Sequence, residues 1–344
     1  MPTDKVDDFI TAQIHERQIA GLSLAIIQDG KIIKEQGYGF GDKSGKSPIT
    51  PTTLFQAGSV SKSLTAFGVL RLVEKGQLSL DADVNTHLRA WKMPENEFTK
   101  DSKVTLRGIL THSAGLTVHG FPGYAVGSPV PTLLEVLDGV KPANTPPIRV
   151  DTIPGSQSRY SGGGYTVMQQ MIIDVTGKSF QKFMRDHVLQ PLGMIHSTYE
   201  QPLPPEMAGS TTTGYDAGGK MILGRHHVYP EMAAAGLWTT AADLARFAIG
   251  IQQSFAGDSN SLLSQSMARL MLTNHKNNYG FGVIVEGSKK KLRFYHGGRN
   301  RGFDAFLMAY ANTGNGVVIL INANDDSGMF KDFFKTIAKE YRWP

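Results

Sequence analysis

Residues 55–67 read FQAGSVSKSLTAF and carry a serine, Ser59, three residues before a lysine, Lys62. Apolar residues recur at spacings of three and four over 60–75, which predicts a helix that Gly76 ends. Residues three apart share one face of a helix, so the Ser59 hydroxyl and the Lys62 amine are expected to touch. A serine beside a neutral amine, at a helix start with unpaired N–H groups, is a candidate nucleophile. Taken alone, the same spacing also fits an N-cap serine and a solvated lysine.

Two further polar segments accompany this pair. Tyr160–Gly162 lie within SRYSGGGY, just before a helical pattern over 165–175. His296–Gly298 lie among the β-type segments near the C-terminus, with Arg299 as the next residue. The chain therefore presents Ser-x-x-Lys, then a tyrosine about 100 residues later, then a basic residue followed by two glycines.

Strands at both ends of the chain and helices between them predict the fold class. The β-type runs on both sides of Asp29-Gly30 predict a hairpin over 22–40, because both turn positions need positive φ. We expect an α+β fold in which an antiparallel β-sheet is flanked by terminal helices and interrupted by an inserted, mostly helical lobe. Residues 1–80 and 266–344 are assigned to the sheet domain and 81–265 to the insert, with the functional site in the cleft between them. Further strands are expected over 279–286, 292–295, 303–311 and 316–322, further helices over 5–19, 105–111, 165–175, 180–188, 241–252 and 330–341, and a surface loop over 129–147.

Composition excludes several classes of function. The 344 residues include no cysteine, which removes disulfide scaffolds, thiolate metal sites and a cysteine nucleophile. The net charge is only +5, so nucleic acid is not expected as a partner, and no apolar run approaches the length of a membrane span, so no such span is expected. There is no GxSxG or HExxH pattern, and the adjacent histidines at 226–227 fit a loop better than a metal site. We expect no metal and no organic cofactor.

The first residues, MPTDKVDDF, are acidic where a secretory signal is basic and then apolar. A cytoplasmic location is therefore expected for the chain as it stands, and a periplasmic or secreted one if a leader has been trimmed.

The three segments together resemble the penicillin-recognising serine hydrolases, whose characteristic sequence motifs begin with Ser-x-x-Lys. The similarity is closest to the class C β-lactamase branch, with its D-alanyl-D-alanine carboxypeptidase and family VIII carboxylesterase relatives. It extends over most of the chain, since VTLRGILTHSAGL (104–116), VLQPLGMIHSTY (188–199) and AAAGLWTTAADLARF (233–247) resemble further family segments. The resemblance implies a β-lactamase/transpeptidase-like fold and a serine acyl-enzyme.

The resemblance also implies roles for individual residues. Ser59 would attack a carbonyl carbon, and Lys62 and Tyr160 would transfer protons, although the sequence leaves open which of the two is the general base. The oxyanion hole would consist of the backbone N–H groups of Ser59 and Arg299. His112, within 104–116, is expected to brace the two lobes rather than take part in the chemistry.

Two departures from the family pattern bear on the substrate. Gly162 stands where the family has an asparagine that binds the acyl-amide carbonyl of the substrate. His296 replaces a lysine, and its imidazole is expected to hold a substrate carboxylate when protonated. Gly297 and Gly298 are expected to let the strand edge approach the substrate, because a Cβ would crowd it.

These departures favour a carboxylesterase-like hydrolase with weak β-lactam activity. A D-alanyl-D-alanine carboxypeptidase, a D-aminopeptidase and an efficient β-lactamase remain alternatives. A non-catalytic protein that binds cell-wall peptides in the same cleft is an alternative from another class, and an acyltransferase is a further one. We expect a small ester, peptide or β-lactam as the substrate, while the natural substrate and the oligomeric state stay open.

Overall fold

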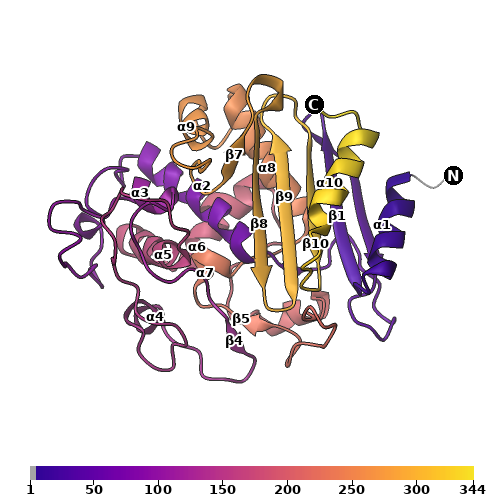
Figure 1. Ribbon diagram of the computed structural model, residues 1–344, viewed down its shortest axis with the longest axis horizontal. Helices are drawn as coiled ribbons and strands as arrows, with labels where there is room; N and C mark the ends of the chain where they lie inside the picture. Colours follow the sequence, from indigo (N-terminus) through magenta and orange to yellow (C-terminus); the bar gives the residue numbers. More distant parts are fainter. Residues whose placement is uncertain (1–4) are drawn as a thin grey trace.

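The computed structural model describes residues 5–344. A six-stranded antiparallel sheet, in the order β2-β1-β10-β9-β8-β7, forms its centre (Figure 1). The expected fold class, an antiparallel sheet with helices, is confirmed. The strands of this sheet are β1 (Gly21–Gln28), β2 (Lys31–Gly39), β7 (Ile284–Glu286), β8 (Arg293–Asn300), β9 (Phe303–Tyr310) and β10 (Gly316–Ile321). Two short pairs lie apart from it, β3 (Phe55–Gln56) with β6 (Trp238–Thr239) and β4 (Tyr124–Ala125) with β5 (His227–Val228).

The helices mostly begin and end near the residues that the sequence predicts. The α-helices are α1 (Lys5–Glu16), α2 (Ser61–Glu74), α3 (Leu106–Leu110), α4 (Leu133–Asp138), α5 (Gly162–Thr176), α6 (Phe180–Met184), α7 (Met232–Ala235), α8 (Ala241–Ala256), α9 (Gln265–Met271) and α10 (Met329–Glu340). Short 3₁₀ turns are η1 (Gly58–Val60), η2 (Val84–Thr86), η4 (Gln190–Leu192), η5 (Pro205–Ser210) and η6 (Lys289–Lys291), and η3 (Arg185–Leu189) is a π-helical turn.

The β1–β2 hairpin turns at Asp29 and Gly30, whose φ values are 51° and 71°. Gln28 pairs with Lys31 across the turn. Positive φ at both central residues is what a two-residue turn of matching twist requires. The hairpin is therefore confirmed, including the residues at which it reverses.

Both faces of the sheet are buried, because successive side chains of β1 belong in turn to two different hydrophobic clusters. Leu22, Leu24 and Ile26 pack in a cluster with apolar side chains of α1 and α10. Ala25 and Ile27 belong to the larger cluster on the opposite face, where α8 contacts β1, β9 and β10. Successive side chains of a strand point to opposite faces, so a strand covered on both sides is apolar throughout. Figure 1 shows α1 and α10 side by side on one side of the sheet.

Three expected elements differ in detail. The segment 129–147, expected to be a surface loop, contains α4, which begins with a capping box between Thr132 and Glu135. Only Ile284–Glu286 of the expected strand 279–286 is extended, because the chain turns at Gly282, whose φ is 73°. β8, in contrast, continues through the two glycines to Asn300, beyond the expected 292–295.

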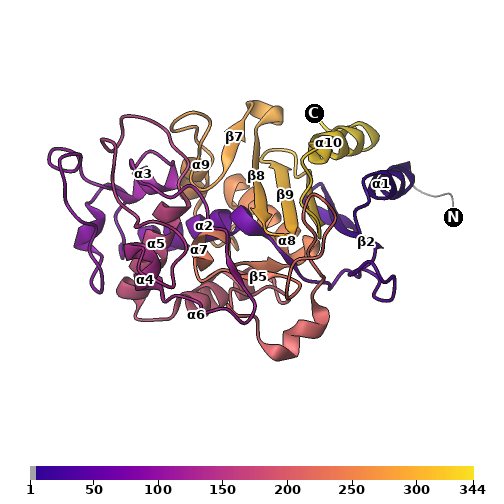
Figure 2. The same cartoon turned by 60° about the horizontal axis from the view of Figure 1, so that its bottom comes forward.

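The assignment of residues to two domains stays a prediction. Helix α8 lies within the predicted insert and packs on the sheet. Helix α2 lies within the predicted sheet domain, and it contacts α5 and α7. Figure 2 shows α2 between the sheet strands and helices α5 and α6. Both helices therefore link the sheet to the helical part, and the start of α2 brings Ser59 to the junction.

Candidate active site

Ser59 and Lys62 meet where the turn η1 runs into α2. The Lys62 amine donates a hydrogen bond to the Ser59 hydroxyl at 2.9 Å. It donates a second one to the backbone carbonyl of Ala234, in α7, at 2.8 Å. The expected contact between the two side chains is therefore present, and a carbonyl from a distant helix orients the amine toward the serine.

The Lys62 side chain is removed from water. Only 2% of the residue is exposed, and burial lowers the pKa of the amine from 10.5 to about 7. No carboxylate of the described chain contributes to this shift. Burial disfavours the charged ammonium form. The two oxygens beside the amine, those of Ser59 and Ala234, are neutral and do not stabilise the ammonium form as a carboxylate would. A substantial fraction of Lys62 is thus unprotonated near neutral pH, the state that a general base requires.

Tyr160 lies against the same pair from the segment before α5. The Lys62 nitrogen is 5.0 Å from the centre of the Tyr160 ring. Burial raises the pKa of the Tyr160 phenol, and a hydrogen bond with Ser59 opposes this only in part. The phenol therefore keeps its proton at neutral pH. In this arrangement it can donate a proton, whereas Lys62 can accept one.

His112 positions Tyr160. The two rings stack with their centres 4.2 Å apart, and only 3% of His112 is exposed. Its Nδ1 accepts the N–H of Ser161 at 3.1 Å, and the Ser161 hydroxyl caps α5 by accepting the N–H of Gly164. Burial, followed by the charge of Lys62, lowers the pKa of His112 well below its usual 6.5. His112 is therefore an uncharged platform for the Tyr160 ring.

The turn η1 and strand β8 approach each other too closely for side chains between them. A Cβ on Gly298 would lie 1.9 Å from the Ala57 carbonyl oxygen and 3.1 Å from the Ser59 nitrogen. A Cβ on Gly58 would lie 2.5 Å from the Arg299 nitrogen. The backbone nitrogens of Ser59 and Arg299 are thus brought to one place beside the Ser59 hydroxyl. Paired N–H donors in such a place can stabilise an oxyanion.

The two glycines of β8 do not serve the same purpose. A Cβ on Gly297 would find its nearest neighbour, the Ala305 carbonyl oxygen, 4.0 Å away. The close approach therefore requires glycine at Gly298 and not at Gly297. Both glycines were expected to avoid crowding by a Cβ. For Gly297, no contact within the described chain supports this expectation.

His296 faces the cleft as an uncharged ring. Its Nδ1 lies 2.5 Å from the Gly297 carbonyl, which can only accept, so Nδ1 carries the proton and Nε2 is an acceptor. Burial, followed by the charge of Lys62, lowers the pKa of His296 to about 4. The expected mode of binding, a protonated imidazole on a substrate carboxylate, therefore has no support at neutral pH. The geometry instead offers an acceptor to a substrate N–H or O–H group.

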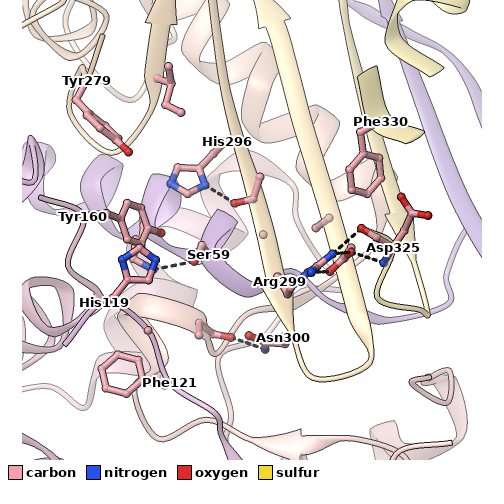
Figure 3. Close-up of a pocket in the computed structure, with 18 residues that line it drawn as sticks. Ser59, His119, Phe121, Tyr160, Tyr279, His296, Arg299, Asn300, Asp325 and Phe330 are labelled. Carbon is pink, nitrogen blue, oxygen red and sulfur yellow. Dashed lines mark hydrogen bonds and ion pairs between the residues drawn. The ribbon is translucent and has the colours of Figure 1, made fainter. Parts of the chain in front are cut away.

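The Arg299 side chain is already paired. Its guanidinium contacts both carboxylate oxygens of Asp304, at 2.8 and 2.6 Å, and Asp326 at 2.6 Å. A two-pronged pair of this kind fixes the guanidinium plane. Arg299 therefore contributes its backbone N–H to the cleft, while its charge is compensated beside it (Figure 3).

Backbone and an aromatic ring occupy the space beside Gly162. The Gly162 N–H donates to the His119 carbonyl at 3.0 Å. A Cβ on Gly162 would lie 3.0 Å from the Phe121 ring and 3.1 Å from that carbonyl oxygen. The segment 119–121 thus lies against the position at which the resemblance implies an asparagine. A side chain there would require the Phe121 ring or the His119 carbonyl to shift by a few tenths of an ångström.

These residues line a cleft of about 570 Å³. Figure 3 shows Tyr160, His119 and His296 around Ser59, with Phe121 on one side and the Arg299 pair on the other. All the predicted site residues except Gly162 line the cleft, and Gly162 lies behind Phe121. The lining residues are Ser59, Lys62, His119, Gly120, Phe121, Tyr160, Ala235, Tyr279, Ile284, His296, Gly297, Gly298, Arg299, Asn300, Asp304, Ala305, Asp325 and Phe330.

Neither His119 nor the Ala234 carbonyl is indicated by a pattern in the sequence. His119 is exposed at the mouth of the cleft, and its ring centre is 4.9 Å from that of Tyr160. Its position follows from the hydrogen bonds that join 117–119 to the start of α5, and no local pattern reveals such contacts. The carbonyl of Ala234 belongs to the backbone, so no residue type marks it.

Within residues 5–344, no group of three or more histidine, aspartate or glutamate residues could hold a metal ion. No helix in that range is long and apolar enough to cross a membrane.

Comparison with known proteins identifies relatives along nearly the whole chain. The family model described as Beta-lactamase matches residues 6–338. Protein flp of Staphylococcus aureus (strain MW2) is 26% identical over 335 residues, which are 94% of this chain and 63% of that protein. The chain thus spans less than two thirds of the length of flp. The putative penicillin-binding protein PbpX of Bacillus subtilis (strain 168) is 26% identical over 307 residues, 86% of this chain and 69% of that protein.

Solved structures share the fold. The octameric penicillin-binding protein homologue from Pyrococcus abyssi superposes with a TM-score of 0.77 at 24% identity, over 98% of this chain and 77% of that one. FmtA from Staphylococcus aureus superposes with a TM-score of 0.77 at 21% identity, over 99% of this chain and 90% of that one. At this level of identity the likeness concerns the fold alone.

The two glycines of β8 provide a matched pair of substitutions. Gly298→Ala is expected to push β8 away from Ala57 and to separate the two N–H donors, whereas Gly297→Ala finds open space. Loss of one oxyanion donor typically lowers kcat by about 10²–10³-fold. We expect a loss of that order, with a lower melting temperature, for Gly298→Ala only. Ester turnover and thermal melts of both variants test this, and equal behaviour of the two would contradict the geometry.

Proposed function

The chain belongs to the beta-lactamase family, and we propose that it is a serine hydrolase that forms an acyl-enzyme at Ser59 and acts best on small esters. The observation that carries the proposal is the 2.9 Å hydrogen bond between Ser59 and a buried Lys62 that has no carboxylate partner in the described chain. A hydroxyl beside an amine that is largely unprotonated near neutral pH is an activated nucleophile. The class C branch stays a prediction, since the comparisons identify the family and not the branch.

In the proposed acylation, Lys62 accepts the Ser59 proton as the Ser59 oxygen bonds to the carbonyl carbon. The electron pair of the C=O bond moves to its oxygen, and the N–H groups of Ser59 and Arg299 stabilise the charge. The pair then returns and the bond to the leaving alcohol breaks. Tyr160 donates its proton to that alcohol and recovers one from the Lys62 ammonium. Water repeats the sequence in place of Ser59 and releases the acid.

The shape and charge of the cleft support esters over β-lactams. Gly162 provides no amide for the acyl-amide of a penicillin, and Phe121 and the His119 carbonyl lie tightly against the position of its missing side chain. His296 is uncharged at neutral pH, and the Arg299 guanidinium is held by Asp304. Among the described residues, a substrate carboxylate next to His296 would therefore have only the Lys62 amine as a nearby uncompensated cation, and protonation of that amine removes the base. A short ester needs neither contact.

The alternatives differ in what the cleft would have to supply. A D-alanyl-D-alanine carboxypeptidase would need a partner for the substrate carboxylate, and within residues 5–344 the amine whose charge acts on His296 is that of Lys62, which the proposed mechanism uses as the base. A D-aminopeptidase and an acyltransferase would use the same Ser59 chemistry. A purely binding protein would not need a buried amine beside a serine, since burying it costs free energy.

The first prediction concerns the nucleophile. A fluorophosphonate should add to Ser59, and intact-mass and peptide mass spectrometry locate the adduct. Ser59→Ala should lose about 10³-fold or more of ester turnover, as nucleophile deletions usually do. Ser61→Ala is a control for the neighbouring hydroxyl, which is buried and donates to the Gly58 carbonyl at 2.6 Å. An adduct at Ser61 or Ser161 would refute the assignment.

The second prediction concerns the general base. If Lys62 accepts the proton, kcat/KM must rise with pH through the pKa of its ammonium, about 7, and then level off. Tyr160→Phe should lower the plateau without moving this limb. Stopped-flow or steady-state rates with a p-nitrophenyl ester give the profile. A limb only above the ordinary phenol pKa of 10.0 would instead assign the base to Tyr160.

The third prediction concerns substrate selection. The wild-type protein should turn over p-nitrophenyl butyrate far faster than a cephalosporin. Gly162→Asn alone should change this preference little, because Phe121 obstructs the new amide. The double variant Gly162→Asn/Phe121→Ala should shift the ratio toward the β-lactam by about tenfold, the value of one hydrogen bond of about 1.4 kcal/mol. Phe121→Ala alone is the control.

Two results would contradict this account of selection. One is a wild-type protein that hydrolyses the cephalosporin as fast as the ester at matched concentrations. The other is a Gly162→Asn variant that gains β-lactam activity with the Phe121 ring still in place.

A further inference from the structure

A second cavity, of about 280 Å³, lies at the C-terminal end of α2. Arg71 and Lys75 of α2, Lys178 after α5 and His187 in the π-helical turn η3 line it. At 1.5 Å per residue, Arg71 and Lys75 are about 14–20 Å along the helix from Lys62. The cavity is thus separate from the cleft that holds Ser59.

The lining of this cavity contains three cations and no carboxylate. The acidic residues nearest in sequence already have partners. Glu74 accepts the N–H of Ser264 at 3.0 Å, and Asp186 pairs with the side chains of two basic residues, Lys182 and Arg185. No carboxylate that lines the cavity therefore compensates its positive charge, and the nearest one outside the lining, Glu74, acts on Arg71 only.

Lys178 pairs with a neutral imidazole. Its amine lies 2.9 Å from Nε2 of His187. An ammonium group only donates hydrogen bonds, so Nε2 accepts and His187 is uncharged. Burial, followed by the charges of Lys178, Lys75 and Arg71, lowers the pKa of His187. The charges of all three cations thus act on the same group of the cavity wall, the His187 imidazole.

The ends of α2 and α5 do not account for these cations, and of the three only Arg71 has a carbonyl partner in η3, that of His187. Basic side chains near a helix C-terminus often cap its last carbonyls. Here the carbonyls of Leu72 and Val73 in α2 accept the N–H groups of Gln77 and Gly76. In α5, the Ile173 carbonyl accepts the N–H of the residue that follows the helix. Backbone groups therefore already satisfy these carbonyls.

We propose that this cavity binds a phosphate group, with Arg71, Lys75 and Lys178 as its cationic ligands. A tetrahedral phosphate dianion carries more negative charge than a carboxylate and presents its oxygens in several directions, which suits three cations that come from different segments. The volume exceeds what inorganic phosphate needs, so the phosphate of a small ester also fits. The proposal does not depend on the chemistry at Ser59.

Binding of phosphate is tested with the wild-type protein and charge-matched variants. Isothermal titration with sodium phosphate, at constant ionic strength set by chloride, should give saturable binding to the wild type. Lys178→Gln and Lys75→Gln should each weaken it about tenfold, as the loss of one charged hydrogen bond predicts. Lys290→Gln removes the same charge from an exposed lysine elsewhere and should leave binding unchanged. Glycerol 3-phosphate, titrated in parallel, separates recognition of the phosphate group alone from that of a larger ester.

A second readout follows His187 directly. A bound anion favours the protonated imidazole, so NMR should show the pKa of His187 rising when phosphate is added. Ester turnover should be the same in all three lysine variants. The proposal is overturned if neither phosphate compound binds better than chloride, or if Lys178→Gln binds them as well as the wild type does. These outcomes are independent of whether Ser59 is catalytic.

Discussion

The removal of the Lys62 amine from water is the interaction on which the rest of the site depends. The amine is held by two neutral oxygens, on Ser59 and Ala234, and lies 5.0 and 5.7 Å from the ring centres of Tyr160 and Tyr165. Burying an ammonium ion costs several kcal/mol unless an anion accompanies it. No anion of the described chain does so here, and the amine responds by releasing its proton near pH 7. The environment that makes Lys62 expensive to bury also makes it basic in the required range.

The need to hold the Lys62 amine away from water also explains why other polar residues of the segment 55–67 are buried. Besides Lys62, the hydroxyls of α2 bind the segment around α7, which supplies the carbonyl to the amine. The Thr65 hydroxyl donates to the Ala233 carbonyl at 3.1 Å, and the Ser61 hydroxyl accepts the N–H of Leu237 at 3.1 Å. Strand β8 joins the same segment, because the Asn300 amide donates to the Ala235 carbonyl at 3.0 Å. Elements far apart in sequence are thereby fixed around one serine.

Local patterns predicted what depends on local geometry. Asp29-Gly30 indicated the hairpin because positive φ is a property of the turn itself, and the spacing of Ser59 and Lys62 indicated their contact because helical periodicity sets it. The space beside Gly162 could not be predicted in this way, since Phe121 reaches it through contacts between distant segments. Helix α4 was not predicted, because it is short and prolines lie on both sides of it, and frequent prolines indicate a loop.

The state of the groups beside His296 determines how such a cleft can accelerate a reaction: the Arg299 guanidinium is paired, and Lys62 serves as the proposed base. Interactions accelerate a step only when they are stronger in the transition state than in the bound substrate. A cation that held a carboxylate would bind both states alike, whereas the N–H groups of Ser59 and Arg299 act on charge that appears only as the tetrahedral intermediate forms. With His296 uncharged and the Arg299 side chain paired, the proposed chemistry relies on that developing charge. Carbonyls that accept negative charge readily, as those of activated esters do, are then the substrates that gain most from the site.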